Sequence, residues 1–332
     1  MNMKKSFLFI VIMSLVLCAC TPAPQPRQAQ SSFICASAQS CAVVSNRLIT
    51  ADRGSVKCFD LSGNVEFERE LEQADAVISA SGDNAAAYCV GGKTVVLSSG
   101  DTIETENDIT GVSASESGMT AVCTLCAGYE GLVTVYSPDA EPVYRWYSAN
   151  AAVAAAQVSP NGEYLAVLTA DEIHIFSLDS EEKRGLYKAP EAMHTLCWTD
   201  DNVCGIADTG VYFCDDEGDS EGACRLTGLT TGIYAVLDDK LIIQLSDARG
   251  EETAYIIDGG DIRSSVSVEG QILGIHCRGD EILILTQDTV GIYSDSAQPL
   301  SSMNAAGAEA AFLLSGGRVL TVGGGTAQIL KP

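Results

Sequence analysis

The sequence predicts an all-β protein, a β-propeller of eight four-stranded blades closed by an N-terminal strand. Three observations lead to this prediction. A repeat of near-constant length runs through the chain, each repeat contains segments with strand patterns, and the last repeat lacks a final strand. No segment shows sustained helical periodicity, so alternating β/α architectures are poor candidates.

The repeat is marked by an alternating strand that enters a small or acidic turn. The first residues of successive units are 38, 39, 40, 38, 43, 36 and 37 positions apart. This near-constant period is typical of a repeat architecture. The units are VKCFDLSG (56–63), TVVLSSG (94–100), VTVYSPDA (133–140), IHIFSLDS (173–180), VYFCDDEG (211–218), AYIIDGGD (254–261), VGIYSDSA (290–297) and AQILKP (327–332).

Each of these strands is preceded by two others, of which YLAVLT and AAAQVS are examples, with turn residues between them. A more polar fourth segment follows, as in NVEFEREL and PVYRWYS. Four strands in about 40 residues are typical of a propeller blade. Two alternatives stay open: seven blades, if one divergent unit is a decorated loop, and an open β-solenoid of the same period.

The end of the chain predicts how the ring closes. The eighth unit stops at Pro332, directly after its third strand. The segment FICAS (33–37) can supply the missing fourth strand, which would leave no unpaired final edge.

Two short segments resemble known propeller repeats. VSPNGEYLAVLT (158–169) resembles the S-P-D-G-x-x-L-A motif of TolB-type and WD-type repeats. FDLSGNVEFE (59–68) is similar to the D-x-x-T-G-x-x-x-W segment of pyrroloquinoline-quinone-type repeats, with Ser for Thr and Phe for Trp. The whole chain resembles uncharacterised propeller-like lipoproteins of Gram-positive anaerobes, a family that supplies no function to carry over.

The N-terminus carries an export signal. MNMKK is followed by twelve uncharged residues, a pattern typical of a secretory signal. This run is shorter than the roughly 20 apolar residues that a transmembrane helix needs. Leu17-Cys18-Ala19-Cys20 resembles the bacterial lipobox, which implies cleavage after Ala19 and lipidation of Cys20. We therefore expect a signal peptide at 1–19, a lipidated cysteine and disordered tether at 20–32, and a single propeller domain at 33–332.

This anchor predicts an extracytoplasmic protein attached to the cell membrane. In a cell with two membranes, threonine rather than aspartate at position 21, directly after the lipidated cysteine, resembles the pattern of lipoproteins sorted to the outer membrane. The protein would then lie on the outer membrane or on the periplasmic side. The layout, a lipobox followed by an eight-blade ring, resembles the propeller lipoprotein of the outer-membrane β-barrel assembly machinery.

Charge and composition exclude several classes of partner and cofactor. The formal net charge is −25, and removal of Lys4 and Lys5 with the signal gives −25 − 2 = −27. This charge argues against nucleic acid as a partner and against docking on anionic headgroups. The chain has two tryptophans and 6% aromatic residues. These are too few to enclose a quinone cofactor between flat aromatic rings, or to stack on the sugar rings of a carbohydrate ligand. We therefore predict no cofactor.

The cysteines are expected to be mainly reduced. Besides Cys18 and Cys20, eleven remain, and most lie in strand-like runs, where they resemble small buried hydrophobes. The pairs most suited to form disulfides are Cys35/Cys41, Cys123/Cys126 and Cys214/Cys224.

No set of residues converges on catalytic chemistry, and we assign no catalytic, cofactor-binding or metal-binding residue. His174 is expected to pack between blades, whereas His194 and His276 lie in first strands that would line a channel. Cys123-x-x-Cys126 matches half of a zinc site, but the sequence has no second Cys-x-x-Cys pair to complete it. The acidic residues 215–219 lack the ligand spacing of a calcium-binding loop, so a solvent-exposed turn is favoured there.

These observations predict a non-enzymatic, membrane-anchored propeller that binds an unknown protein or peptide in the cell envelope or acts as a scaffold there. Two alternatives stay open. One is an envelope hydrolase or lyase with a site at the channel mouth near His276. The other is a sensor of small ligands or cations.

Overall fold

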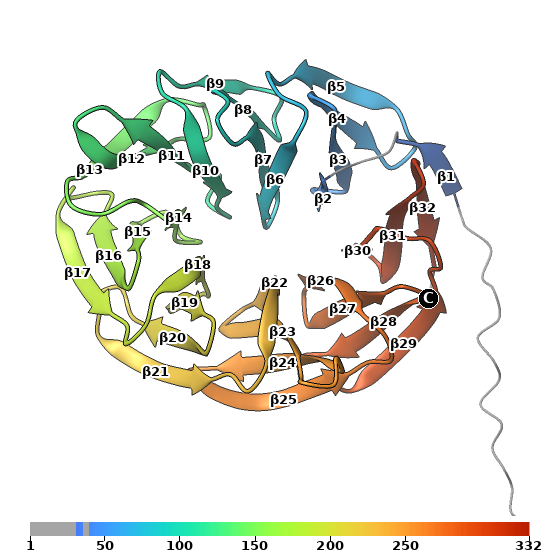
Figure 1. Cartoon of the computed structure of the whole chain (residues 1–332). Helices are drawn as coiled ribbons and strands as arrows, with labels where there is room; N and C mark the ends of the chain where they lie inside the picture. Colours follow the sequence, from blue (N-terminus) through green and yellow to red (C-terminus); the bar gives the residue numbers. More distant parts are fainter. Residues whose placement is uncertain (1–30, 36–39, 332) are drawn as a thin grey trace, which may run out of the picture.

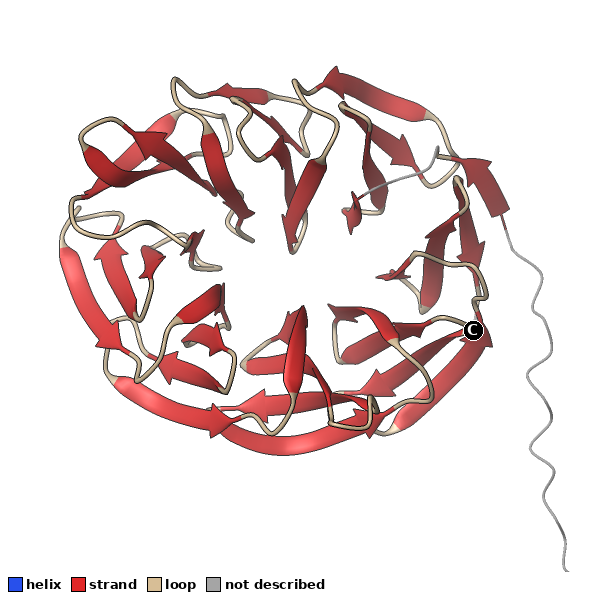
Figure 2. Cartoon of the chain, viewed as in Figure 1, coloured by secondary structure: helices blue, strands red, loops and turns tan. Residues whose placement is uncertain are grey.

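The protein is a ring of eight four-stranded sheets (Figure 1). A computed structural model describes residues 31–35 and 40–331. Every regular element in these residues is a strand (Figure 2), and none of them forms a helix suited to cross a membrane. The predicted eight-bladed propeller is confirmed, and the alternatives of seven blades and of an open solenoid are wrong.

Each blade is an antiparallel meander, and the blades are numbered I to VIII by the order of their innermost strands. The innermost strands are β2 (Ser40–Val44), β6 (Ala76–Ser81), β10 (Ile109–Ala114), β14 (Ala155–Val158), β18 (Met193–Trp198), β22 (Leu229–Leu237), β26 (Ile272–Arg278) and β30 (Ala310–Leu314). The second strands are β3 (Arg47–Asp52), β7 (Asn84–Cys89), β11 (Thr120–Cys126), β15 (Tyr164–Thr169), β19 (Val203–Ala207), β23 (Lys240–Ser246), β27 (Glu281–Thr286) and β31 (Arg318–Gly323).

The outer half of each blade contains the predicted marker strand and a more polar edge strand. The third strands are β4 (Ser55–Asp60), β8 (Thr94–Leu97), β12 (Tyr129–Tyr136), β16 (Glu172–Ser177), β20 (Gly210–Cys214), β24 (Glu252–Asp258), β28 (Thr289–Ser294) and β32 (Thr326–Leu330). The fourth strands are β5 (Val65–Glu70), β9 (Thr102–Glu104), β13 (Pro142–Ser148), β17 (Lys183–Lys188), β21 (Ser220–Arg225), β25 (Asp261–Ser267), β29 (Pro299–Asn304) and β1 (Ser31–Ile34).

The core lies between neighbouring blades. Second strands such as β15 and β27 are buried along almost their whole length, because both faces of each sheet pack against another sheet. Fourth strands such as β5 are largely exposed, which explains their polar composition. Burial of the apolar strands on both faces is the main stabilising term, at about 25 cal/mol per Å² of apolar surface.

The meander gives the ring two distinct faces. Turns between first and second strands and between third and fourth strands lie on one face, which we call the hairpin face. Turns between second and third strands and the connections from blade to blade lie on the other, the crossover face. The motif VSPNGEYLAVLT forms a hairpin-face turn as predicted, with Ser159 Oγ 2.7 Å from Asn161 Oδ1 and Gly162 at φ +80°.

The ring closes through β1, which pairs antiparallel with β32 as the fourth strand of blade VIII (Figure 1). The predicted closure is confirmed, although the strand begins at Ser31, two residues before the predicted start. Backbone hydrogen bonds, rather than side chains, form this pairing, and exposed serines are tolerated on an edge strand. Residues 36 and 37 of the predicted strand lie outside the described residues.

Phe33 packs β1 into the interface between blades VIII and I. Its ring lies 5.9 Å from that of Phe59, next to a buried cluster that contains Leu48 and Ile329. Gly63, at φ +87°, lies against it, and a Cβ there would come within 2.5 Å of the Cβ of Phe33. The glycine of FDLSGNVEFE is therefore required both by its backbone conformation and by the approach of β1.

We expect Phe33→Ala to lower the free energy of unfolding by about 2 kcal/mol, less than a fully buried Phe would cost because Phe33 is only partly buried. The matched control is Ile34→Ala, because Ile34 is the next residue of the same strand and is 82% exposed. Urea unfolding of the full chain measures both. Equal effects of the two substitutions would contradict the role of β1 in closure.

Candidate functional site

The histidines singled out in the sequence have structural partners. His174 is confirmed as a side chain packed between blades, because its ring lies 5.4 Å from that of Trp146 of blade III. Its Nε2 lies 3.0 Å from Thr169 Oγ1, and its Nδ1 lies 3.1 Å from Lys183 Nζ. Burial and the nearby ammonium lower the pKa of His174, so it is neutral in this position.

His276 and His194 share no partner. His276 Nδ1 accepts a hydrogen bond from the Leu313 backbone amide at 3.2 Å, and its ring meets Phe312 edge-on. Burial lowers the pKa of His276 to about 4, so the neutral ring joins blades VII and VIII. His194 Nδ1 lies 2.9 Å from Thr195 Oγ1 on an exposed position. Among the described residues, no three His, Cys, Asp or Glu side chains are grouped to hold a metal ion.

None of the eleven described cysteines is bridged to another, as predicted for most of them. The pairs Cys35/Cys41, Cys123/Cys126 and Cys214/Cys224, expected as exceptions, are also unbridged. Burial raises the pKa of Cys123 to about 12, whereas Cys126 is partly exposed beyond an irregularity in the strand. Cys20, the predicted lipidation site, lies outside the described residues.

The acidic segment 215–219 forms a hairpin-face turn, as favoured from sequence. Asp215 Oδ1 accepts hydrogen bonds from the backbone amides of Glu217 and Asp219, at 3.0 and 2.8 Å. Arg184 of blade IV pairs with Glu217 at 3.1 Å. The Asp215 carboxylate therefore stabilises the turn, and the Glu217 carboxylate joins blades IV and V.

An acidic rim, made of Asp83, Glu116, Asp200 and Asp238, lies at first hairpins of four blades on the hairpin face. Burial and repulsion from the other three carboxylates raise the pKa of Glu116. Burial and repulsion from Asp238 and Asp201 also raise the pKa of Asp200. Glu116 and Asp200 therefore oppose folding at neutral pH, and the rim places four carboxyl groups on this face.

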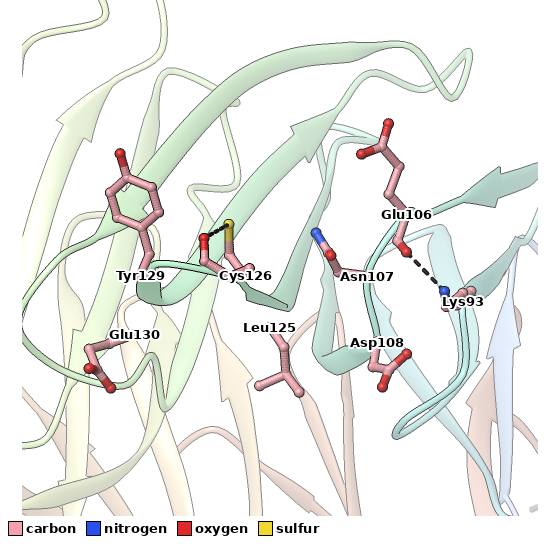
Figure 3. Close-up of a pocket in the computed structure, with 9 residues that line it drawn as sticks. Lys93, Glu106, Asn107, Asp108, Leu125, Cys126, Tyr129 and Glu130 are labelled. Atoms are coloured by element: carbon pink, nitrogen blue, oxygen red, sulfur yellow. Dashed lines mark hydrogen bonds between the residues drawn. The ribbon is translucent and has the colours of Figure 1, made fainter.

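The crossover face carries an open cavity of about 450 Å³ at the junction of blades II and III (Figure 3). It lies between the connection 105–108 and the turn 126–129. Asp108, Leu125 and Glu130 extend to one side of this turn, whereas Tyr129 and Asn107 extend to the other. Leu125 and Tyr129 are 55% and 48% exposed, which places apolar surface at the cavity.

Backbone hydrogen bonds hold the cavity wall in place. The Thr105 amide donates to the Lys93 carbonyl at 2.8 Å, and Lys93 Nζ donates to the Glu106 carbonyl at 2.9 Å. On the other side, the Leu125 amide donates to the Asp108 carbonyl at 3.0 Å. The connection is therefore tied to the second-to-third-strand turn of blade II and to blade III.

A β-bulge lies opposite Leu125. The register between β11 and β12 shifts between Thr124 and Cys126, and two residues of β12 oppose the single residue Leu125. On the other side of β11 the Leu125 amide donates to the Asp108 carbonyl, and the leucine side chain faces solvent instead of the core. Bulges are frequent next to functional sites.

The sequence motifs did not predict this cavity. Cys123-x-x-Cys126 was assessed only as half a zinc site or a disulfide pair. The detectable signal was the segment TLCAGYE, in which the large side chains Leu125 and Tyr129 flank a turn that contains glycine.

Comparisons with known proteins support the fold. A family model described as a family of unknown function (DUF5711) matches residues 28–172. No curated protein matches the chain in sequence. The family match covers the N-terminal part of the chain, from before β1 to the start of β16.

Several solved propellers are similar in structure at low identity. Sqt1 of Saccharomyces cerevisiae has a TM-score of 0.68 and 9% identity, covering 93% of this chain and 100% of that one. Chaetomium thermophilum Sqt1 bound to the N-terminus of the ribosomal protein L10 has a TM-score of 0.64 and 13% identity, covering 92% and 100%. BamB from Moraxella catarrhalis has a TM-score of 0.59 and 16% identity, covering 92% and 97%.

We expect Glu116→Gln to raise the melting temperature at pH 7 by about 1 °C. The raised pKa of Glu116 means that folding is penalised once pH rises above the unfolded value, and the penalty is complete above the folded value. At pH 3 the carboxyl is protonated in both states and the substitution should have no effect. Calorimetry of Glu116→Gln and of the exposed control Glu221→Gln tests this. A Glu116→Gln gain that persists at pH 3 would contradict the electrostatic cause.

Cys126 should be the fastest-reacting thiol in the folded chain. The other partly exposed thiols among the described residues, Cys41 and Cys277, have pKa values raised to about 12 by burial, which disfavours the reactive thiolate. The measurement is labelling with a thiol reagent in a Cys18→Ser, Cys20→Ser background. Cys126→Ser should remove the fast phase, and a fast phase that survives this change would refute the assignment.

Proposed function

We propose that this protein is a membrane-anchored, non-enzymatic β-propeller that binds a protein partner in the cell envelope through its crossover face. The observation that carries the proposal is the open cavity beside exposed Leu125 and Tyr129, built on a rigid closed ring. His276, beside which the enzymatic alternative placed its site, bonds the Leu313 backbone amide, and His194 makes a local contact with Thr195.

The similar propellers support a binding role as an analogy. The Chaetomium thermophilum Sqt1 structure contains the N-terminus of a ribosomal protein, which shows that a propeller with similar architecture binds a polypeptide segment. At 13% identity this likeness concerns the fold, so the proposal for this chain depends on its own cavity.

The lipobox supports the membrane anchor. Ser31 pairs with Ile329 near the end of β32, so the chain enters β1 from the hairpin face. A lipid on Cys20 would therefore hold the hairpin face nearer the membrane. The crossover face would then be directed toward partners.

We expect Cys20→Ser to release the protein from the membrane fraction, because two acyl chains on this cysteine would supply the stable anchoring. The measurement is fractionation of cells that express either form, with Cys126→Ser as the cysteine control. A Cys20→Ser variant that stays membrane-bound would contradict the anchor without affecting the proposed binding role.

Photo-crosslinking in cells tests the binding role. A photoreactive residue in place of Tyr129 or Leu229, both exposed on the crossover face, should give an adduct with another protein. The same residue in place of Ile262, exposed on the outer strand β25, is the control and should give none. Absence of adducts from both crossover positions would contradict the proposed function.

A further inference from the structure

We propose that the cavity at the junction of blades II and III binds a short polypeptide segment in which a lysine or arginine neighbours an apolar residue. This inference rests on the proposed protein-binding function and adds the chemistry of the partner. Three properties of the cavity lead to it: an exposed apolar contact, carboxylates that no described residue pairs with, and a pre-formed wall.

The apolar contact is Leu125. This leucine lies opposite the bulge in β12, where it is 55% exposed and lacks the burial that a strand residue normally gains. Contact with an apolar residue of a ligand would remove this surface from water. Tyr129, held at 4.9 Å from the ring of Tyr147, adds a fixed aromatic surface on the other side of the turn.

The negative charge of the cavity favours a ligand in which a cationic residue stands next to the apolar residue. Glu106, Asp108 and Glu130 line the cavity, against a single cation, Lys93. Lys93 Nζ is already bonded to the Glu106 backbone carbonyl, and no hydrogen bond or ion pair occupies the three carboxylates within the described residues. Asp108 and Glu130 extend to the same side as Leu125, one on each flank of it, so a cation beside the apolar contact meets a carboxylate on either flank (Figure 3).

The cavity needs little rearrangement to bind. Its connection is fixed at both ends by the hydrogen bonds to Lys93 and Leu125, so few degrees of freedom are lost when a ligand enters. A volume of about 450 Å³ suits two or three side chains rather than a folded domain. The carboxylates also disfavour acidic segments and nucleic acid.

The experiment uses an array of immobilised twelve-residue peptides probed with the full chain in detergent. One set contains lysine or arginine beside leucine, phenylalanine or tyrosine, and the matched set carries aspartate or glutamate at the cationic positions. The basic set should bind and the acidic set should not. Leu125→Ser should weaken binding about tenfold, because it removes the apolar contact.

The double variant Asp108→Asn, Glu130→Gln should weaken binding about fivefold at low salt and remove the salt dependence. Its control is Asp139→Asn, Glu221→Gln, which changes the net charge equally at exposed positions away from the cavity, and Leu300→Ser controls for loss of an exposed apolar side chain. Both controls should bind like the unaltered chain.

Two results would overturn the inference. Basic peptides that bind all variants equally would place their site elsewhere while leaving the proposed function intact. Binding of the acidic set, or of neither set, would refute the assigned chemistry. In that case adducts from the photoreactive Tyr129 or Leu229 position would show that the protein-binding function still holds, and their absence would show that both have failed.

Discussion

The pairing of β1 with β32 is the constraint on which the rest of the structure depends. It joins an N-terminal strand and the last strand of the chain in one sheet, so that blade VIII has a fourth strand and β32 is paired on both sides. Phe33 on this strand adds to the apolar cluster shared by blades VIII and I. Closure therefore combines backbone pairing with the same interblade burial that stabilises every other junction.

A closed ring fixes neighbouring blades relative to one another, and this fixes the crossover-face cavity. The connection 105–108 spans blades II and III and is hydrogen-bonded to both. Leu125 and Asp108 therefore keep their relative positions without a ligand. The chemistry of the cavity comes from one bulge and a few exposed side chains, whereas its rigidity comes from the ring as a whole.

The fold could be predicted from the sequence because its strand period repeats along the chain and each marker strand ends in a turn. Closure by the N-terminal segment followed from the truncated last unit. The cavity could not be predicted in the same way, because it depends on the bulge at Leu125 and on contacts between residues of different blades. Likewise, the first strands suggested a channel position for His276 but could not show that its Nδ1 holds Leu313.

Hydrogen–deuterium exchange of the full chain, with and without a basic–apolar peptide, tests the central claim most directly. We expect slower exchange confined to residues 105–108 and 125–130, with the strands of the ring already protected in the free protein. Slower exchange on the hairpin face, or no change in these two segments at saturating peptide, would contradict the claim that a pre-formed cavity on a closed ring is the binding site.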